Sequence, residues 1–165
     1  MENKKDLFFS GLIIIVFLFA GFFLIKHFSK SFVNHRPENI KYVEIGGQKI
    51  KVDLALTEAE QTQGLSGRHS LLPNTGMLFI FNKPGYYPFW MPNMNFSIDM
   101  IWLAPSEGGD NLTAKVDYIA KDATPESYPV TFGPKDNNAK YVLEVADGFS
   151  DKNNLKVGDS VIFTY

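Results

Sequence analysis

The sequence predicts a mainly β protein: a compact antiparallel barrel or sandwich with one or two short helices, preceded by a single transmembrane helix. Three observations lead to this fold class. Short apolar runs with strand-like patterning alternate with Gly-, Pro- and Asn-rich breaks, only one segment carries a helix start signal, and residues 7–25 contain no charged side chain. The chain therefore divides into an N-terminal tail (1–6), an anchor (7–25), a linker (26–39) and a β domain (40–165).

The anchor is predicted from Leu7–Ile25, an uncharged apolar run. At about 1.5 Å per residue it would span roughly 28 Å, close to the hydrocarbon core of a bilayer. A cleaved signal peptide is the alternative, but its apolar region is usually only about 7–15 residues and ends at a small-residue cleavage site, which this run lacks. We therefore expect the membrane to be a partner of this chain.

The charged residues on either side of the anchor bear on its orientation in the membrane. Two lysines precede the run, whereas Lys26, Lys30 and Arg36 follow it, so the positive-inside count mildly opposes an external domain. A six-residue tail before an apolar run nevertheless has the layout of an export signal. We expect the domain to lie outside the cytoplasm.

The first half of the domain reads as a hairpin, a helix and a strand. Residues 42–45 and 48–56 alternate apolar and polar side chains around Gly46-Gly47, which favours a β-hairpin. Thr57 and Glu60 have capping-box spacing, so a short helix is predicted from Glu58. Residues 77–81 form the next predicted strand, which Lys83-Pro84-Gly85 should end, and residues 89–91 begin a further element that Pro92 interrupts.

The second half contains the predicted centre of the sheet. Residues 98–103 are apolar on both faces, apart from Asp99, and indicate a central strand; further strands are expected at 112–120, 141–146 and 160–165. Residues 122–138 include three prolines and no periodicity. A loop of that length inside a compact domain is often a lid or a binding loop, although a solvated excursion is equally compatible.

Composition excludes several functional classes. From Ser31 onward there are 12 Lys and Arg against 16 Asp and Glu, a net charge near −4, with no basic stretch suited to nucleic acid. The absence of cysteine removes disulfides, thiolate nucleophiles and cysteine zinc sites. No serine-hydrolase elbow, phosphate loop or zinc-protease motif occurs either, so neither a cofactor nor a metal is expected.

Two carboxylates in apolar strands are the candidates for chemistry. Asp99 shares a strand face with Ile101, and Glu144 shares one with Val142. A desolvated carboxylate must be paired, hydrogen-bonded or protonated. Asp99 could serve binding or acid–base chemistry, or could be structural, tied to Arg68 or to the backbone. If the two carboxylates faced one another, they would suit glycoside hydrolysis.

Methionines and aromatics crowd residues 77–102. Four methionines with His69 could suggest a copper(I) site, but core packing explains their spacing better. Trp90, with Tyr86, Tyr87 and Phe89, could form a stacking platform for a ligand, or could simply be buried.

The order of several sequence blocks resembles a known family. These blocks are Thr57…Glu60…Gly64-Leu65…Arg68, Gly76-Met77-Leu78-Phe79-Ile80-Phe81, Phe89-Trp90-Met91-x-Asn93, Ile98-Asp99-Met100-Ile101 and Ala139-x-Tyr141-Val142-Leu143-Glu144. From about Ile40 onward the chain is similar to the family called domain of unknown function 192. The resemblance implies a mostly antiparallel β domain, commonly exported or membrane-anchored in prokaryotes, with no established reaction, cofactor or substrate.

The resemblance marks motif positions without giving them roles. Ser66 stands where family members often have Met, and Pro92 and Met94 flank Asn93 where Lys and Thr are usual. The matched positions, which we take as candidate ligand-binding residues, are Arg68, Trp90, Asn93, Asp99 and Glu144.

The function expected from the sequence is a membrane-anchored, extracytoplasmic binding or envelope-associated module. Its ligand would be a neutral or weakly polar glycan or peptide of the envelope, held between residues 86–93 and the 122–138 loop. A hydrolase of envelope glycans using Asp99 and Glu144 is one alternative. A structural partner of another membrane protein is another.

Overall fold

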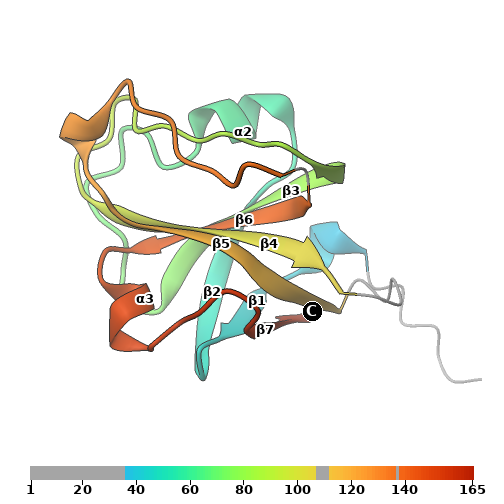
Figure 1. Ribbon diagram of the computed structural model, residues 1–165. Helices are drawn as coiled ribbons and strands as arrows, with labels where there is room; N and C mark the ends of the chain where they lie inside the picture. Colours follow the sequence, from blue (N-terminus) through green and yellow to red (C-terminus); the bar gives the residue numbers. More distant parts are fainter. Residues whose placement is uncertain (1–35, 107–111, 137) are drawn as a thin grey trace, which may run out of the picture. The chain divides into compact units, whose positions relative to one another are not determined.

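The domain is a closed seven-stranded β-barrel (Figure 1). This computed structural model describes residues 36–106, 112–136 and 138–165. Around the barrel the strand order is β1-β2-β3-β6-β4-β5-β7, and β7 pairs with β1 to close it. The strands are β1 (Tyr42–Ile45), β2 (Gln48–Ala55), β3 (Thr75–Gly85), β4 (Ile98–Pro105), β5 (Thr113–Ala123), β6 (Ala139–Ala146) and β7 (Ser160–Thr164).

Within the described ranges, four short helical segments accompany the strands. The α-helices are α2 (Glu58–Gln63) and α3 (Phe149–Lys152), and the 3-10 turns are η1 (Pro37–Asn39) and η2 (Pro125–Ser127). Helix α2 begins as predicted: the Thr57 side chain accepts from the Glu60 backbone N–H, and the Glu60 carboxylate accepts from the Thr57 N–H. The predicted mainly β fold with short helices is confirmed, and its architecture is a barrel.

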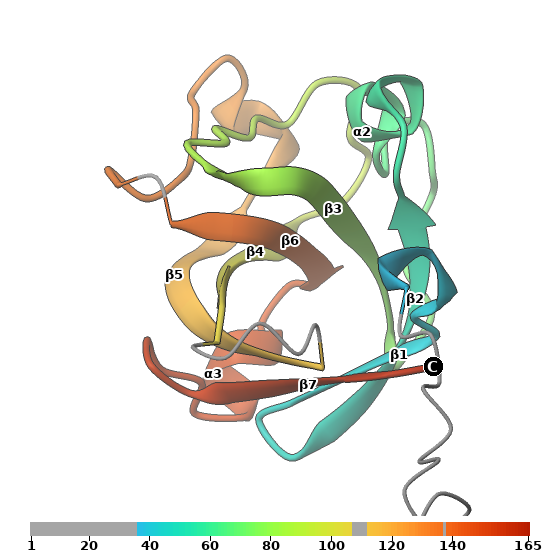
Figure 2. The ribbon, with the colours of Figure 1, turned by 90° about the vertical axis from the view of Figure 1, so that its right-hand side faces the viewer.

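The strands bury side chains on both faces of the sheet. The barrel interior holds one apolar cluster, to which all seven strands contribute, for example Val43, Ile50, Leu78, Ile101, Val116, Leu143 and Phe163. A second cluster lies on the outer face of β3, β6, β4 and β5, where α2 and the long connections cover the sheet (Figures 1 and 2). This second cover explains why β4 and β6 are apolar on both faces.

The second cluster accounts for the methionine-rich stretch. Met77, Met91 and Met100 are buried there, and Met94 packs against it. Trp102 is fully buried in the same layer and donates its indole N–H to the Tyr87 carbonyl oxygen at 2.8 Å. These side chains form the core between the sheet and its covering connections.

Three details of the structure differ from the elements that the sequence predicts. Strand β3 continues through Lys83-Pro84-Gly85, with an irregular register between Ile80 and Gly85, instead of ending before them. The pair β2–β3 is parallel, so the sheet is not wholly antiparallel. Residues 89–91 form no strand; Phe89 makes only an isolated bridge to Phe132.

The predicted anchor, Leu7–Ile25, lies outside the described residues. Within the ranges that the structure describes, no helix is long and apolar enough to cross a membrane.

Candidate ligand pocket

A pocket opens on the outer face of the sheet, between α2 and the segment that follows β3. Its volume is about 360 Å³. The lining is mostly apolar, with a polar edge supplied by α2, and comprises Glu58, Gln61, Thr62, Gln63, Gly64, Leu65, Ser66, Phe79, Phe81, Tyr87, Pro88, Phe89, Trp90, Pro92, Met94 and Glu144. The combination of an apolar lining and a few polar groups is typical of small-ligand sites.

Glu144 is the buried charged residue of this pocket. It lies in β6 and is only 5% exposed, and its Oε2 atom has no hydrogen-bond partner. Its paired residues on the two neighbouring strands are Met77 on β3 and Met100 on β4, and neither side chain is a polar partner for the carboxyl group. Because burial disfavours the charged form, the pKa of Glu144 rises from about 4.5 to about 8. At neutral pH its carboxyl group is mostly protonated.

Arg68 is the basic residue whose charge acts on Glu144. Its charge lowers the pKa of Glu144, against the larger effect of burial. Its guanidinium is bonded to Asp53, with Nη1 to Oδ2 at 2.8 Å. Asp53 pairs with Met77 in the register, and Met77 pairs with Glu144, so the two carboxyl groups belong to one row across the outer face. Arg68 itself is not part of the pocket lining.

Helix α2 and its following turn form one wall. Gln61 fixes this wall to the sheet, because its Nε2 donates to the carbonyl oxygens of Ala55 (3.3 Å) and Ile80 (3.0 Å). The Ser66 hydroxyl donates to the Pro92 carbonyl oxygen at 2.8 Å and joins this wall to the opposite one. Ser66 and Pro92 are two of the positions at which the sequence departs from the family's usual pattern.

Aromatic rings form the opposite wall. Phe81 and Tyr87 stack with centroids 3.5 Å apart, and Phe89 meets Phe79 edge-on at 4.8 Å. Trp90 remains 48% exposed at the mouth. The phenylalanine and tyrosine rings of this wall are therefore held in place by one another, whereas the Trp90 ring has a face exposed to solvent.

A second, more open hollow of about 1130 Å³ adjoins the pocket. Trp90 and Pro92 line both, and Asn93 lines only the second. Asn93 takes a left-handed backbone conformation (φ 53°), and its carbonyl oxygen accepts from the Gly67 N–H at 2.9 Å. The candidate residues Trp90, Asn93 and Glu144 are thus brought to one region, with Arg68 beside it.

Asp99 lies outside the pocket, and its partners are backbone N–H groups. Its carboxylate accepts two backbone N–H bonds, from Asp122 at 3.0 Å and from Ser150 at 2.7 Å. The suggested pairing with Arg68 was wrong, because Arg68 bonds to Asp53; the alternative of backbone partners is what the structure contains.

The two buried carboxylates also face away from one another. Asp99 pairs with Val145, which packs inside the barrel, whereas Glu144 pairs with Met100, which packs in the outer cluster. Successive residues of a strand point to opposite faces, so the sheet separates the two side chains. This geometry does not provide the facing pair of carboxylates that glycoside hydrolysis requires.

The 122–138 connection does not line the pocket. Its described part runs behind the aromatic wall, where Phe132 and Phe89 exchange backbone hydrogen bonds of 2.7 and 2.9 Å. The pocket therefore lies between residues 87–94 and α2, whereas the sequence predicted a ligand surface between residues 86–93 and the 122–138 connection. Glu58, Gln61 and Leu65 were missed, since only the capping-box signal pointed to that helix.

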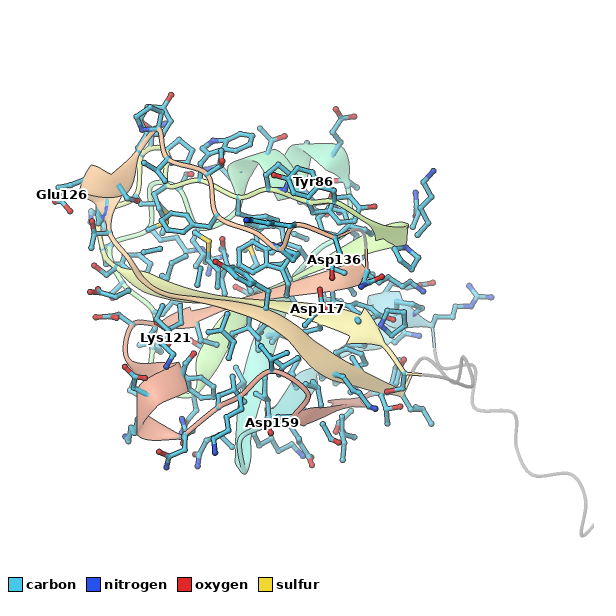
Figure 3. The ribbon with its side chains drawn as sticks, viewed as in Figure 1. Tyr86, Asp117, Lys121, Glu126, Asp136 and Asp159 are labelled. Carbon is cyan, nitrogen blue, oxygen red and sulfur yellow. The ribbon has the colours of Figure 1, made fainter. Side chains whose placement is uncertain are left out.

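Two other carboxylates lie close together on the barrel. Asp117 on β5 and Asp136 are neighbours in Figure 3. Partial burial and the charge of Asp136 raise the pKa of Asp117. Neither residue lines the pocket.

Comparison with known proteins gives the chain its family but not its activity. Two solved bacterial structures are similar. A protein of Sinorhizobium meliloti 1021 named "putative transcription regulator" is 26% identical with a TM-score of 0.63, covering 74% of this chain and 90% of its own. A protein of unknown function from Novosphingobium aromaticivorans DSM 12444 is 28% identical with a TM-score of 0.65, covering 76% of this chain and 89% of its own.

No curated protein matches the chain. Residues 41–163 match the family model DUF192, whose description is "Uncharacterized ACR". That match includes residues of all seven strands, the whole pocket lining and Glu144. The chain belongs to the DUF192 family.

Proposed function

We propose that this protein is a membrane-anchored binding module whose pocket takes the apolar part of a small ligand or peptide and bonds one polar group of it through Glu144. The observation that supports this most is the unpartnered, buried Oε2 atom of Glu144 in an otherwise apolar pocket of about 360 Å³. Buried polar atoms normally have partners, so one that has none suggests a partner from outside.

The lining favours an apolar body over a sugar ring. Filling the pocket would remove apolar surface of both partners from water, at roughly 25 cal/mol per Å² before the cost of association. A sugar would bring several hydroxyl groups into a site with few polar partners, and each unpaired hydroxyl opposes binding. Of the two envelope ligands considered, the pocket favours a peptide or another apolar molecule over a glycan.

The anchor and the location complete the proposal. Leu7–Ile25 would hold the domain at a membrane, and we place the domain on the outer side, where envelope molecules would be within reach. Nucleic acid is not favoured as a partner because the chain from Ser31 onward carries a net charge near −4.

Calorimetry with a neutral amphipathic probe tests the proposal. The purified full-length chain in dodecyl maltoside micelles would be titrated with 4-phenylbutanol, with the protein-free micelles as the blank. We expect saturable binding that Trp90→Ala weakens about tenfold, since that face of the mouth is lost. Tyr86→Ala is the matched control, because Tyr86 is equally exposed at 53% but lines neither hollow.

Two results would count against the proposal. If 4-phenylbutanol and the amine and acid of the same shape, 4-phenylbutylamine and 4-phenylbutyrate, all failed to bind, the pocket would not be a ligand site. If Trp90→Ala and Tyr86→Ala bound as well as the wild-type chain, the probe would be bound elsewhere.

A further inference from the structure

We propose that the polar end of the ligand is a protonated amine, so that the pocket selects amphipathic amines over alcohols and acids of the same shape. This inference rests on the proposed function and specifies its ligand class.

The first argument is an inventory of the polar atoms in the lining. Three polar side chains of the lining already use donors: Gln61 Nε2 donates to two backbone carbonyls, Gln63 Nε2 to the Ser66 carbonyl at 2.8 Å, and the Ser66 hydroxyl to Pro92. The acceptors remain available, namely the Glu144 Oε2 atom and the Glu58 carboxylate, for which the described part of the chain provides no partner. These carboxyl oxygens therefore favour a ligand that carries hydrogen-bond donors of its own.

The second argument is the sign of the charge. Both ionisable carboxyl groups of the lining, Glu58 and Glu144, are acidic, and no Lys or Arg from the described ranges lines either hollow. The exposed ring of Trp90 adds an aromatic face at the mouth, and such faces attract cations. An anionic ligand would meet acidic side chains and no positive charge among the described lining residues, whereas an ammonium group would find both acceptors and an aromatic ring.

The charged surroundings of Glu144 allow it to ionise once a cation arrives. The groups involved come from three elements: Glu58 from α2, Arg68 from the turn after α2, and Asp53 from β2. On β3 and β4 its paired neighbours are methionines. Arg68 alone already favours the carboxylate, but it is bonded to Asp53 and burial outweighs it. A ligand ammonium at Oε2 would supply the missing favourable charge.

The proton exchange follows from this pairing. An aliphatic amine enters as an ammonium ion and keeps its proton. Glu144, protonated in the empty pocket at neutral pH, gives its proton to the buffer and becomes the carboxylate of a charge-assisted hydrogen bond. Binding of the amine therefore releases close to one proton per site at pH 7, whereas binding of the alcohol releases none.

Three probes of one shape test the inference: 4-phenylbutylamine, 4-phenylbutanol and 4-phenylbutyrate. Each would be titrated into the full-length chain by calorimetry at pH 7 in phosphate and in Tris, whose different ionisation enthalpies report the number of protons released. For the wild-type chain we expect the amine to bind about tenfold more tightly than the alcohol, with proton release, and the acid to bind most weakly.

Glu144→Gln provides the matched variant, because it keeps the shape of the side chain but cannot ionise. It should lower the affinity for the amine about tenfold, abolish the proton release, and leave the alcohol affinity within about threefold. Micelle partitioning of the amine is the same for both proteins and cancels in the comparison. Circular dichroism at pH 7 would verify that the variant is folded.

The outcomes separate this inference from the proposed function. If the alcohol binds as tightly as the amine, or if the amine binds without proton release, the inference is overturned while the pocket remains a ligand site. If none of the three probes binds, the proposed function fails and this inference fails with it.

Discussion

At the residue scale, Glu144 is the feature that the fold does not explain by itself. A glutamine or an apolar residue at this position of β6 would avoid the cost of burying an ionisable group without a partner. The carboxyl instead faces a pocket and has one oxygen free. A buried, perturbed carboxyl in a cavity is a candidate functional group on physical grounds.

The raised pKa of Glu144 predicts how stability depends on pH. Between pH 4.5 and about pH 8 the Glu144 carboxyl keeps its proton in the native protein but has lost it in the unfolded chain. The stability contributed by the neutral carboxyl is therefore complete below pH 4.5 and is lost as the pH rises through about 8. From pH 5 to pH 9 the wild-type chain should therefore lose about 2–4 kcal/mol more of its free energy of unfolding than Glu144→Gln does. The variant should be the more stable of the two proteins at pH 9.

Urea unfolding at both pH values would measure this difference. Glu126→Gln, at an exposed position, is the control and should leave the pH dependence unchanged. Parallel pH profiles for wild type and Glu144→Gln would mean that Glu144 ionises freely in the folded protein.

Sequence reasoning at this scale found Glu144 but could not assign its surroundings. The alternation of β6 placed Glu144 on a face with Val142, which is correct and indicated burial. Which covering segment lies over that face depends on contacts between residues far apart in the chain. For the same reason Arg68 was considered a partner of Asp99, whereas in the structure its guanidinium bonds to Asp53.

At the element scale, Asp99 joins three parts of the barrel end. It lies on β4, and its two bonds fix the Asp122 backbone near the end of β5 and the start of α3 at Ser150. Asp122 is held in a left-handed conformation (φ 51°), so its N–H has a fixed direction that a buried acceptor can use.

Removing that acceptor should destabilise the protein. Asp99→Ala leaves two N–H groups without acceptors and should lower the free energy of unfolding by about 2–4 kcal/mol. Asp99→Asn can still accept through one oxygen and should cost about half as much. Denaturant unfolding of both variants would measure this, with Asp53→Ala as an exposed control worth about 1 kcal/mol or less. Equal, negligible effects for both Asp99 variants would show that these bonds do not stabilise the fold.

Most elements, but not their arrangement, could be predicted from the sequence. The β1–β2 hairpin around Gly46-Gly47 and the capped start of α2 depend on local chemistry, and both are confirmed. The parallel β2–β3 pair was missed because α2 and the turn after it carry the chain back before β3 begins, a crossover without a local signal. Likewise, nothing local shows that Phe132 would bridge to Phe89 and turn the 122–138 connection away from the pocket.

At the scale of the whole molecule, the barrel closes among strands that lie between residues 42 and 164. Strand β1 pairs with both β2 and β7, and the interior cluster draws on all seven strands. We therefore expect a chain that starts at Pro37 to fold and to remain in solution, whereas the full chain should stay with membranes through alkaline carbonate washing. Release of an N-terminally shortened protein into the medium would instead identify residues 7–25 as a cleaved signal.

The central claim is that the α2 pocket is a binding site, and an NMR titration tests it most directly. Amide and indole N–H signals of residues 37–165 would be followed as 4-phenylbutylamine is added. The account predicts saturable shifts at Gln61, Leu65, Phe81 and the Trp90 indole, with the barrel end around Asp99 unchanged. Shifts confined to other surfaces, such as the exposed Tyr128–Val130 stretch, or no saturable shifts at all, would contradict it.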